Sequence, residues 1–223
     1  MENRHFEADE RTQFQVDRIA FFSDAVIAIA ITLLILEIKI PPLGAHTRLR
    51  DLPAHVSQHT ALSLMGMAIC FISIGNLWVL HHDLYQHVRN YNKRLVKYNL
   101  YFLLTIMLLP LSTSFTMEPD NPPFLTPSIF FLNLGLCYLT YFLMANVIFS
   151  PKHHFAVRPD KEKLNSMRRH TLAPAIVFTA ASVVAFSGHY GLLYGFLAYP
   201  LVAKAWSYWE RKKHPAAHPH GHV

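Results

Sequence analysis

The sequence is poor in charged residues, in glycine and in cysteine. Charged side chains make up 15% of its 223 residues, well below the roughly 25% of a typical soluble domain. Only 8 glycines are present, and hydrophobic residues reach 52%, which excludes collagen, coiled-coil and disordered chains. The two cysteines, Cys70 and Cys137, lie in apolar runs. Their number and placement exclude a disulfide scaffold and a cysteine-based zinc site.

The sequence instead contains several long apolar runs. A transmembrane helix needs roughly 20 mostly apolar residues to cross about 30 Å of hydrocarbon. Six runs qualify, and they cover residues 19–40, 60–80, 95–115, 125–149, 171–187 and 190–208. The predicted fold class is therefore an all-α, polytopic membrane protein with six transmembrane helices.

Lysine and arginine are distributed unevenly between these runs. With the N-terminus placed inside, sixteen of the 20 basic residues fall in inner segments and a further one, Lys204, lies near the inner end of the last run. Only Lys39, Arg48 and Arg50 fall outside. Cytoplasmic loops carry this excess of positive charge, so both termini are predicted to be cytoplasmic. The inner segments then face the anionic surface of the lipid bilayer, which explains the net charge of +6 without a nucleic-acid partner.

Three regions follow from this map. Residues 1–17 are charged, contain no apolar segment of the kind found in signal peptides, and are predicted to form a cytoplasmic N-terminal segment. Residues 18–209 form the six-helix transmembrane domain. Residues 210–223 are a histidine-rich cytoplasmic tail without fixed metal-ligand spacing, and a solvated tail is expected.

The first apolar run carries an acid, Asp24, about four residues inside the predicted span. An acid at this depth costs roughly 2.5–3.5 kcal/mol on insertion scales and rarely faces lipid. Arg18 is six positions earlier, about 240° around the helix, so the partner of Asp24 is expected on another helix or subunit. Asp24 could serve only as a packing clamp, or it could take part in gating or permeation. The sequence leaves both open.

A second group of polar residues lies at the same predicted depth. Trp78 and His81 close the second apolar run, and Asn99 opens the third. With Arg18, Ser23 and Asp24 of the first run they can converge in one layer at the cytoplasmic side. Buried polar groups of this kind need one another as hydrogen-bond partners, so a polar network is predicted.

Beyond Asp24, three residues share one face of the first helix. Ile29, Thr32 and Leu36 follow the spacing i, i+3 and i+7. Around a symmetry axis they would form two apolar rings with a hydroxyl ring between them, and an apolar ring can gate a pore by dewetting. Any apolar helix has such a stripe, however, and Thr32 could simply bond its own backbone.

The string RIAFFSDAV, residues 18–26, is similar to the R-x-x-x-F-S-D motif of the transmembrane protein 175 family, the endosomal and lysosomal potassium channels and their bacterial homologues. The resemblance continues through AIAITLLILEIKIP, the W-x-x-H-H element at residues 78–82, Asn99-Leu100, and Leu109-Pro110 with Ser112-Thr113. It covers roughly the first half of the chain. The motif with its apolar continuation is specific, whereas W-x-x-H-H alone would not be.

The resemblance implies a homotetramer in which the first helix of each subunit lines the pore. It places an apolar constriction on Ile29, a hydroxyl layer on Thr32 and a further apolar ring on Leu36. The residues that hold the pore helix would be Arg18, Phe22, Ser23, Asp24, Trp78, His81 and Asn99. The implied function is a passive, potassium-permeable cation channel of the bacterial inner membrane, without a TVGYG filter. The resemblance thus implies a protein that is not an enzyme and uses no cofactor or metal, with potassium as the permeant ion.

Two other functions compete with this one. Asp24 and His81 could be the proton relay of a proton-coupled secondary transporter, although inverted halves and broken helices are not evident. His81, His82, Asp83 and His87 could be metal ligands of a membrane enzyme, but no second ligand cluster matches them. The motif favours the channel over both.

Overall fold

The computed structural model describes residues 2–38, 58–118, 120–150 and 161–187. These ranges are helical apart from short turns and helix ends, which confirms the all-α fold class for this part of the chain. The elements are α1 (Glu2–Leu33), a short 3-10 helix η1 (Leu34–Glu37), α3 (Gln58–Tyr85), α4 (Lys93–Met117), α5 (Leu125–Ile148) and α6 (Lys161–Phe186).

Four of these segments are long and apolar enough to cross a membrane. They are Thr12–Leu36, Thr60–Tyr85, Lys93–Met117 and Leu125–Ile148. A fifth apolar stretch, His170–Phe186 in α6, is shorter. Five of the six predicted runs thus coincide with helices, and the sixth, 190–208, lies outside the described residues.

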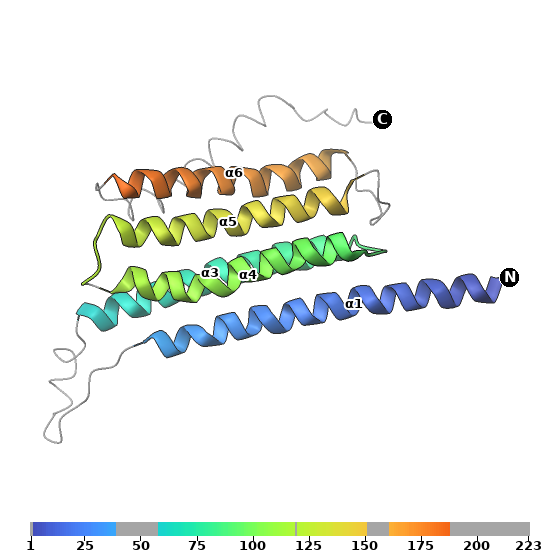
Figure 1. Ribbon diagram of the computed structural model, residues 1–223, viewed down its shortest axis with the longest axis horizontal. Helices are drawn as coiled ribbons and strands as arrows, with labels where there is room; N and C mark the ends of the chain where they lie inside the picture. The colour runs from blue at the N-terminus through green and yellow to red at the C-terminus, as the bar shows by residue number, and fades with distance from the viewer. Residues whose placement is uncertain (1, 39–57, 119, 151–160, 188–223) are drawn as a thin grey trace, which may run out of the picture.

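The helices lie side by side, and consecutive ones run in opposite directions (Figure 1). α6 packs on α5, and α5 packs on α4. α1 lies at the other side of the bundle, against α3 and α4. Within the described helices α1 contacts neither α5 nor α6, so only one face of α1 is covered.

α1 begins far before the apolar run that predicted it. The helix starts at Glu2, 17 residues ahead of position 19, which adds about 25 Å at 1.5 Å per residue. Figure 1 shows this N-terminal part projecting past the turn that joins α3 to α4. Hydropathy marks the part of a helix that crosses a membrane, but the backbone hydrogen bonds that make the helix continue into polar sequence.

α4 is the central helix of the described bundle. Phe102, Ile106 and Leu109 recur at helical spacing and are fully buried. At the start of α4 the Oδ1 atom of Asn92 accepts hydrogen bonds from the backbone N–H groups of residues 94 and 95, which satisfies two donors that the helix leaves free. Pro110 lies inside α4 without ending it. α4 therefore connects both sides of the core along its whole length.

α5 and α6 approach closely at Gly135. A Cβ atom at this position would lie 2.7 Å from Thr179 Oγ1 and 3.1 Å from the Thr179 backbone nitrogen, so only glycine allows the observed distance. Further along, Ser182 Oγ donates a 2.8 Å hydrogen bond to the Ser128 carbonyl. Small residues and hydroxyls are the usual means of packing helices inside a bilayer.

Candidate functional site

α1 has two faces of different character. The face toward α3 and α4 is buried, and its residues recur at helical spacing; they are Val16, Ser23, Ile27, Ala30 and Leu34. The opposite face carries large apolar side chains that are exposed, and these include Phe22, Ile29 and Leu33, followed by Leu36 in η1. α1 is thus anchored along one side and uncovered along the other.

A chain of buried hydrogen bonds fixes the buried face of α1. Ser23 Oγ donates to the Ile19 carbonyl at 2.8 Å, and Asn99 Nδ2 donates to Ser23 Oγ at 2.9 Å. The Oδ1 atom of Asn99 lies 2.9 Å from His81 Nε2. Because an amide oxygen can only accept, His81 Nε2 carries the proton. The chain runs from α3 through α4 to α1 in one direction, and each atom named in it is satisfied.

Aromatic rings hold His81 in place. Its ring stacks on Tyr85, with 4.4 Å between centroids, and on Phe102, with 5.4 Å between centroids and parallel planes. His81 is 1% exposed. Stacking from α3 and α4 restricts the plane of the imidazole, and in this plane Nε2 lies within hydrogen-bond distance of Asn99 Oδ1.

Asp24 has its partner on α3, as predicted for an acid inside a span. Trp78 Nε1 donates a 2.9 Å hydrogen bond to Asp24 Oδ1. This bond lies at the edge of the layer, where Trp78 is exposed and Asp24 is half-buried. The His82 ring lies beside Trp78, 5.8 Å between centroids. Asp24 and Ser23 therefore tie consecutive positions of α1 to two different helices.

Arg18 and Phe22 are not brought into this layer. Both side chains are exposed, and Arg18 makes no hydrogen bond or ion pair within the described part of the chain. Five of the seven predicted network residues thus meet in the structure: Ser23, Asp24, Trp78, His81 and Asn99. A role for Arg18 and Phe22 in holding α1 remains a prediction.

The predicted stripe lies on the uncovered face of α1. Ile29 is 58% exposed and Leu36 is 74% exposed, and Thr32 between them is exposed as well. Thr32 Oγ1 donates to the Ile29 carbonyl at 2.9 Å. The hydroxyl hydrogen is used by the helix, while the oxygen lone pairs stay available on the exposed face.

The residues of the enzyme alternative do not form a metal centre. No three histidine, cysteine, aspartate or glutamate side chains gather to hold a metal ion anywhere in the described ranges. His81 is buried in the hydrogen-bond chain, whereas His82 and Asp83 are exposed. His87 Nδ1 donates to the Asp83 backbone carbonyl at 2.9 Å.

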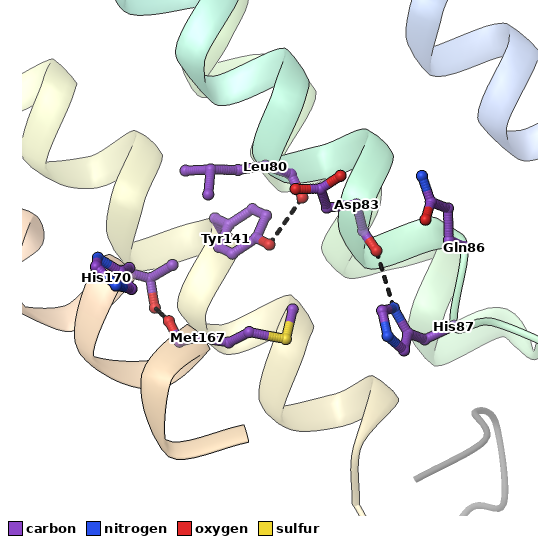
Figure 2. Close-up of a pocket in the computed structure, with 8 residues that line it drawn as sticks. Leu80, Asp83, Gln86, His87, Tyr141, Met167 and His170 are labelled. Carbon is purple, nitrogen blue, oxygen red and sulfur yellow. Dashed lines mark hydrogen bonds between the residues drawn. The ribbon is translucent and has the colours of Figure 1, made fainter. Parts of the chain in front are cut away.

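A pocket of about 370 Å³ lies between α3 and α6, with α5 as its floor (Figure 2). Its lining residues are Leu80, Asp83, Gln86, His87, Tyr141, Met167, His170 and Thr171. Sequence reasoning did not find this site, because its walls come from segments more than 80 residues apart and no motif connects them. His170, which directly precedes the fifth apolar run in a basic and histidine-containing segment, was the sequence feature closest to this pocket.

Comparison with known proteins covers the polar layer and the stripe. Residues 18–110 match the family described as the endosomal/lysosomal potassium channel TMEM175. This range begins at Arg18, includes the whole of α3 and ends within α4. Every residue of the predicted network and stripe lies inside it.

Two relatives are bacterial potassium channels. A potassium channel of Streptomyces collinus is 27% identical over 196 residues, which span 82% of this chain and 93% of the relative. A potassium channel of Chamaesiphon minutus is 33% identical over 108 residues, 48% of this chain and 51% of the relative.

The fold has a counterpart among solved structures. The crystal structure of a lysosomal potassium-selective channel TMEM175 homolog from Chamaesiphon minutus matches with a TM-score of 0.68 and 21% sequence identity. The match covers 86% of this chain and 97% of that chain. The arrangement of helices is therefore the same, although most residues differ.

Proposed function

The chain belongs to the TMEM175 family of potassium channels, and we propose that it conducts potassium passively through a homotetrameric pore lined by α1. The family is one of channels rather than enzymes. The chain itself is a multi-pass membrane protein of this fold.

The uncovered face of α1 is the observation that carries the pore assignment. One side of α1 is fixed to α3 and α4, while Ile29 and Leu36 project from the other side without a partner among the described helices. Ala25 and Ala28 are exposed on the same helix and would let neighbouring copies approach closely. Four copies arranged around this side of α1 would cover it and enclose a channel.

Ile29 and Leu36 then form the narrow parts of the pore. A ring of four isoleucine side chains has no polar atom to replace the water shell of an ion, so the closed ring excludes ions and gates by dewetting. Leu36, in the 3-10 helix η1 that continues α1, forms a second apolar ring seven residues after Ile29.

Thr32 supplies the polar contact between the two rings. Because its hydrogen is donated to the Ile29 carbonyl, its oxygen presents lone pairs to a cation. A single hydroxyl layer replaces a hydration shell only in part, in contrast to the rings of backbone carbonyls in TVGYG filters. Potassium selectivity is accordingly modest.

The polar layer positions the pore helix. Ser23 and Asp24 bond to Asn99 and Trp78, which sets the rotation of α1 and so decides which residues face the axis. Arg18 and Phe22 complete this network through contacts with a neighbouring copy.

The proposed orientation places both termini in the cytoplasm of a bacterial cell and the six-helix channel domain, 18–209, in its inner membrane. Residues 1–17 and the histidine-rich tail 210–223 lie on the cytoplasmic side. The N-terminal part of α1 would then project into the cytoplasm beyond the α3–α4 turn (Figure 1).

A proton-coupled transporter is the alternative, with Asp24 and His81 as its relay. The two residues bond to different partners, Trp78 and Asn99, and the helices of the described part are unbroken. Neither feature suits alternating access around a central site.

Recording from the purified protein in a planar bilayer tests the proposal. We expect ohmic single-channel currents and a reversal potential that shifts toward the potassium equilibrium potential in a potassium–sodium gradient. A tetrameric mass of the purified protein is expected in the same preparation. Saturable flux that follows a proton gradient, without channel currents, would replace the channel with the transporter.

A further inference from the structure

The pocket between α3 and α6 results from how the helices pair. α6 packs on α5, α3 packs on α4, and α3 and α6 make no contact with each other within the described residues. Tyr141 of α5 lies at the floor of this furrow and donates a 2.8 Å hydrogen bond to the Leu80 carbonyl of α3 (Figure 2). Because the Tyr141 hydroxyl hydrogen is donated to this carbonyl, Tyr141 links α5 to α3 at the floor of the pocket.

The α3 wall presents hydrogen-bond acceptors. Asp83 is exposed, and its carboxylate makes no hydrogen bond or ion pair with other described side chains. His87 donates from Nδ1 to the Asp83 carbonyl, so Nε2 is the ring nitrogen left for a ligand. The carboxylate of Asp83 in α3 and the imidazole Nε2 of His87, in the turn directly after α3, suit a ligand group that carries several N–H donors.

The α6 wall presents the opposite chemistry. Figure 2 shows His170 across Tyr141 from Asp83, with the Met167 side chain reaching between the walls. His170 is exposed and can donate to an anionic oxygen. Met167 and Leu80 add apolar surface beside these polar groups. A matching ligand carries a cationic group with N–H donors for the Asp83 side, an anionic group for His170, and an apolar part for Leu80 and Met167.

A single ion does not fit this arrangement. The aspartate and the two histidines do not converge into a metal-binding group in the described structure. The volume of about 370 Å³ lies in the range of small-molecule pockets, which starts near 300 Å³.

The pocket lies where the apolar segments end. The span in α3 runs to Tyr85, and the apolar stretch of α6 begins at His170. Asp83, Gln86 and His87 are therefore at the level where lipid headgroups meet the protein.

We propose that this pocket binds the headgroup of a zwitterionic aminophospholipid, phosphatidylethanolamine, from the leaflet at this end of the bundle. The ammonium donates to Asp83 and His87, the phosphate accepts from His170 and the Gln86 amide, and the acyl chains leave past Leu80 and Met167. The inference requires only that the chain spans a membrane, so it stands or fails independently of the pore.

The charge pattern makes the site selective between lipids. The quaternary ammonium of phosphatidylcholine has no N–H to donate to Asp83, whereas the primary ammonium of phosphatidylethanolamine has three. An anionic lipid such as phosphatidylglycerol has no ammonium group to pair with Asp83.

Native mass spectrometry of the purified full chain, with equal amounts of the three lipids added, tests the proposal. We expect phosphatidylethanolamine to be retained about tenfold over phosphatidylcholine, the worth of one charge-assisted hydrogen bond. Asp83→Asn should abolish this preference, and His170→Leu should weaken retention of phosphatidylethanolamine. Both residues are exposed, so the variants are expected to fold.

Asp120→Asn is the matched control, because Asp120 is an exposed aspartate between α4 and α5, away from the pocket residues. It should keep the full preference. Equal retention of the three lipids, stronger retention of phosphatidylglycerol, or a preference that survives Asp83→Asn would each overturn the proposal.

Discussion

Ile27 and Ile29 are two positions apart on α1, yet Ile27 is 1% exposed and Ile29 is 58% exposed. The angle between them on a helix is about 200°, so one side chain packs in the core while the other points away from it. The same substitution at the two positions therefore distinguishes an effect on the packing of the core, at Ile27, from an effect on the proposed pore, at Ile29.

Ile29→Asn should raise the current and reduce the discrimination between potassium and sodium. An amide at the constriction gives water hydrogen-bond partners, which removes the barrier that an apolar ring presents to ions. Because Ile29 contacts little within its own chain, the stability of the fold should change little. Single-channel recording and reversal potentials measure both effects.

Ile27→Asn is the control and should act on stability instead. It buries an amide among apolar side chains and leaves a gap, which costs about 2–4 kcal/mol in the free energy of unfolding. If the two variants gave the same currents and the same stability, Ile29 would not be the gate.

The bond between Trp78 and Asp24 should contribute about 1 kcal/mol, since it is charge-assisted but partly hydrated. Trp78→Phe removes the N–H donor, and Asp24→Ala removes the acceptor. In denaturant unfolding in detergent micelles, the double variant should lose less than the sum of the two single losses. Additive losses would show that the bond is not used, and a large change in ion selectivity in Asp24→Ala would give Asp24 a role in permeation.

His81 should stabilise the chain through both its hydrogen bond and its stacking. His81→Phe keeps an aromatic ring between Tyr85 and Phe102 but leaves Asn99 Oδ1 without its donor, at a cost of about 1–3 kcal/mol. His81→Ala also loses the stacking and leaves a cavity, so its loss should be larger.

His82→Ala provides the comparison for His81, because His82 is its exposed neighbour. Its effect on the melting temperature should be small. A His81→Phe variant as stable as the wild type would mean that the buried hydrogen-bond chain adds nothing to stability.

Gly135→Ala should destabilise the packing of α5 on α6. The new methyl group would lie 2.7 Å from Thr179 Oγ1 and close to the α6 backbone, and overpacking of this kind costs about 1–3 kcal/mol. Gly75→Ala meets no atom within 4 Å and should stabilise α3 by about 0.5–1 kcal/mol. Thermal unfolding of the two variants should shift in opposite directions; shifts of the same sign would contradict the close contact at Gly135.

Hydropathy predicted the apolar part of each described helix but not where the helix begins. The predicted start of the fifth run, position 171, falls ten residues after α6 begins at Lys161. α1 likewise begins at Glu2 rather than near position 19. Polar first turns carry no apolar signal, since a helix outside the bilayer is held by the same backbone bonds as one inside it.

The sequence predicted that the residues of the polar layer lie at one depth along the helices. It did not predict which of these residues form hydrogen bonds with one another. Six residues near the inner ends of their runs were expected at one level, and the structure brings all of them together except Arg18, which is exposed; the six are Arg18, Ser23, Asp24, Trp78, His81 and Asn99. That Trp78 bonds to Asp24 while His81 bonds to Asn99 depends on the rotation of each helix about its own axis, which the packing of the core determines. The pocket at Asp83 and His170 depends on the same packing and had no sequence pattern to mark it.

Within the described structure, α4 is the main link between α6 and α1, and the smaller contact of α5 with α3 provides a second one. α6 contacts α5, α5 contacts α4 more extensively than α3, and α1 contacts α3 and α4 alone. A change in bilayer thickness or lateral pressure that tilted α6 would therefore reach α1 mainly through α4, a helix of 25 residues. α4 carries Asn99, which is bonded to Ser23 of α1, so a displacement of α4 acts on α1 at the bond between these two residues.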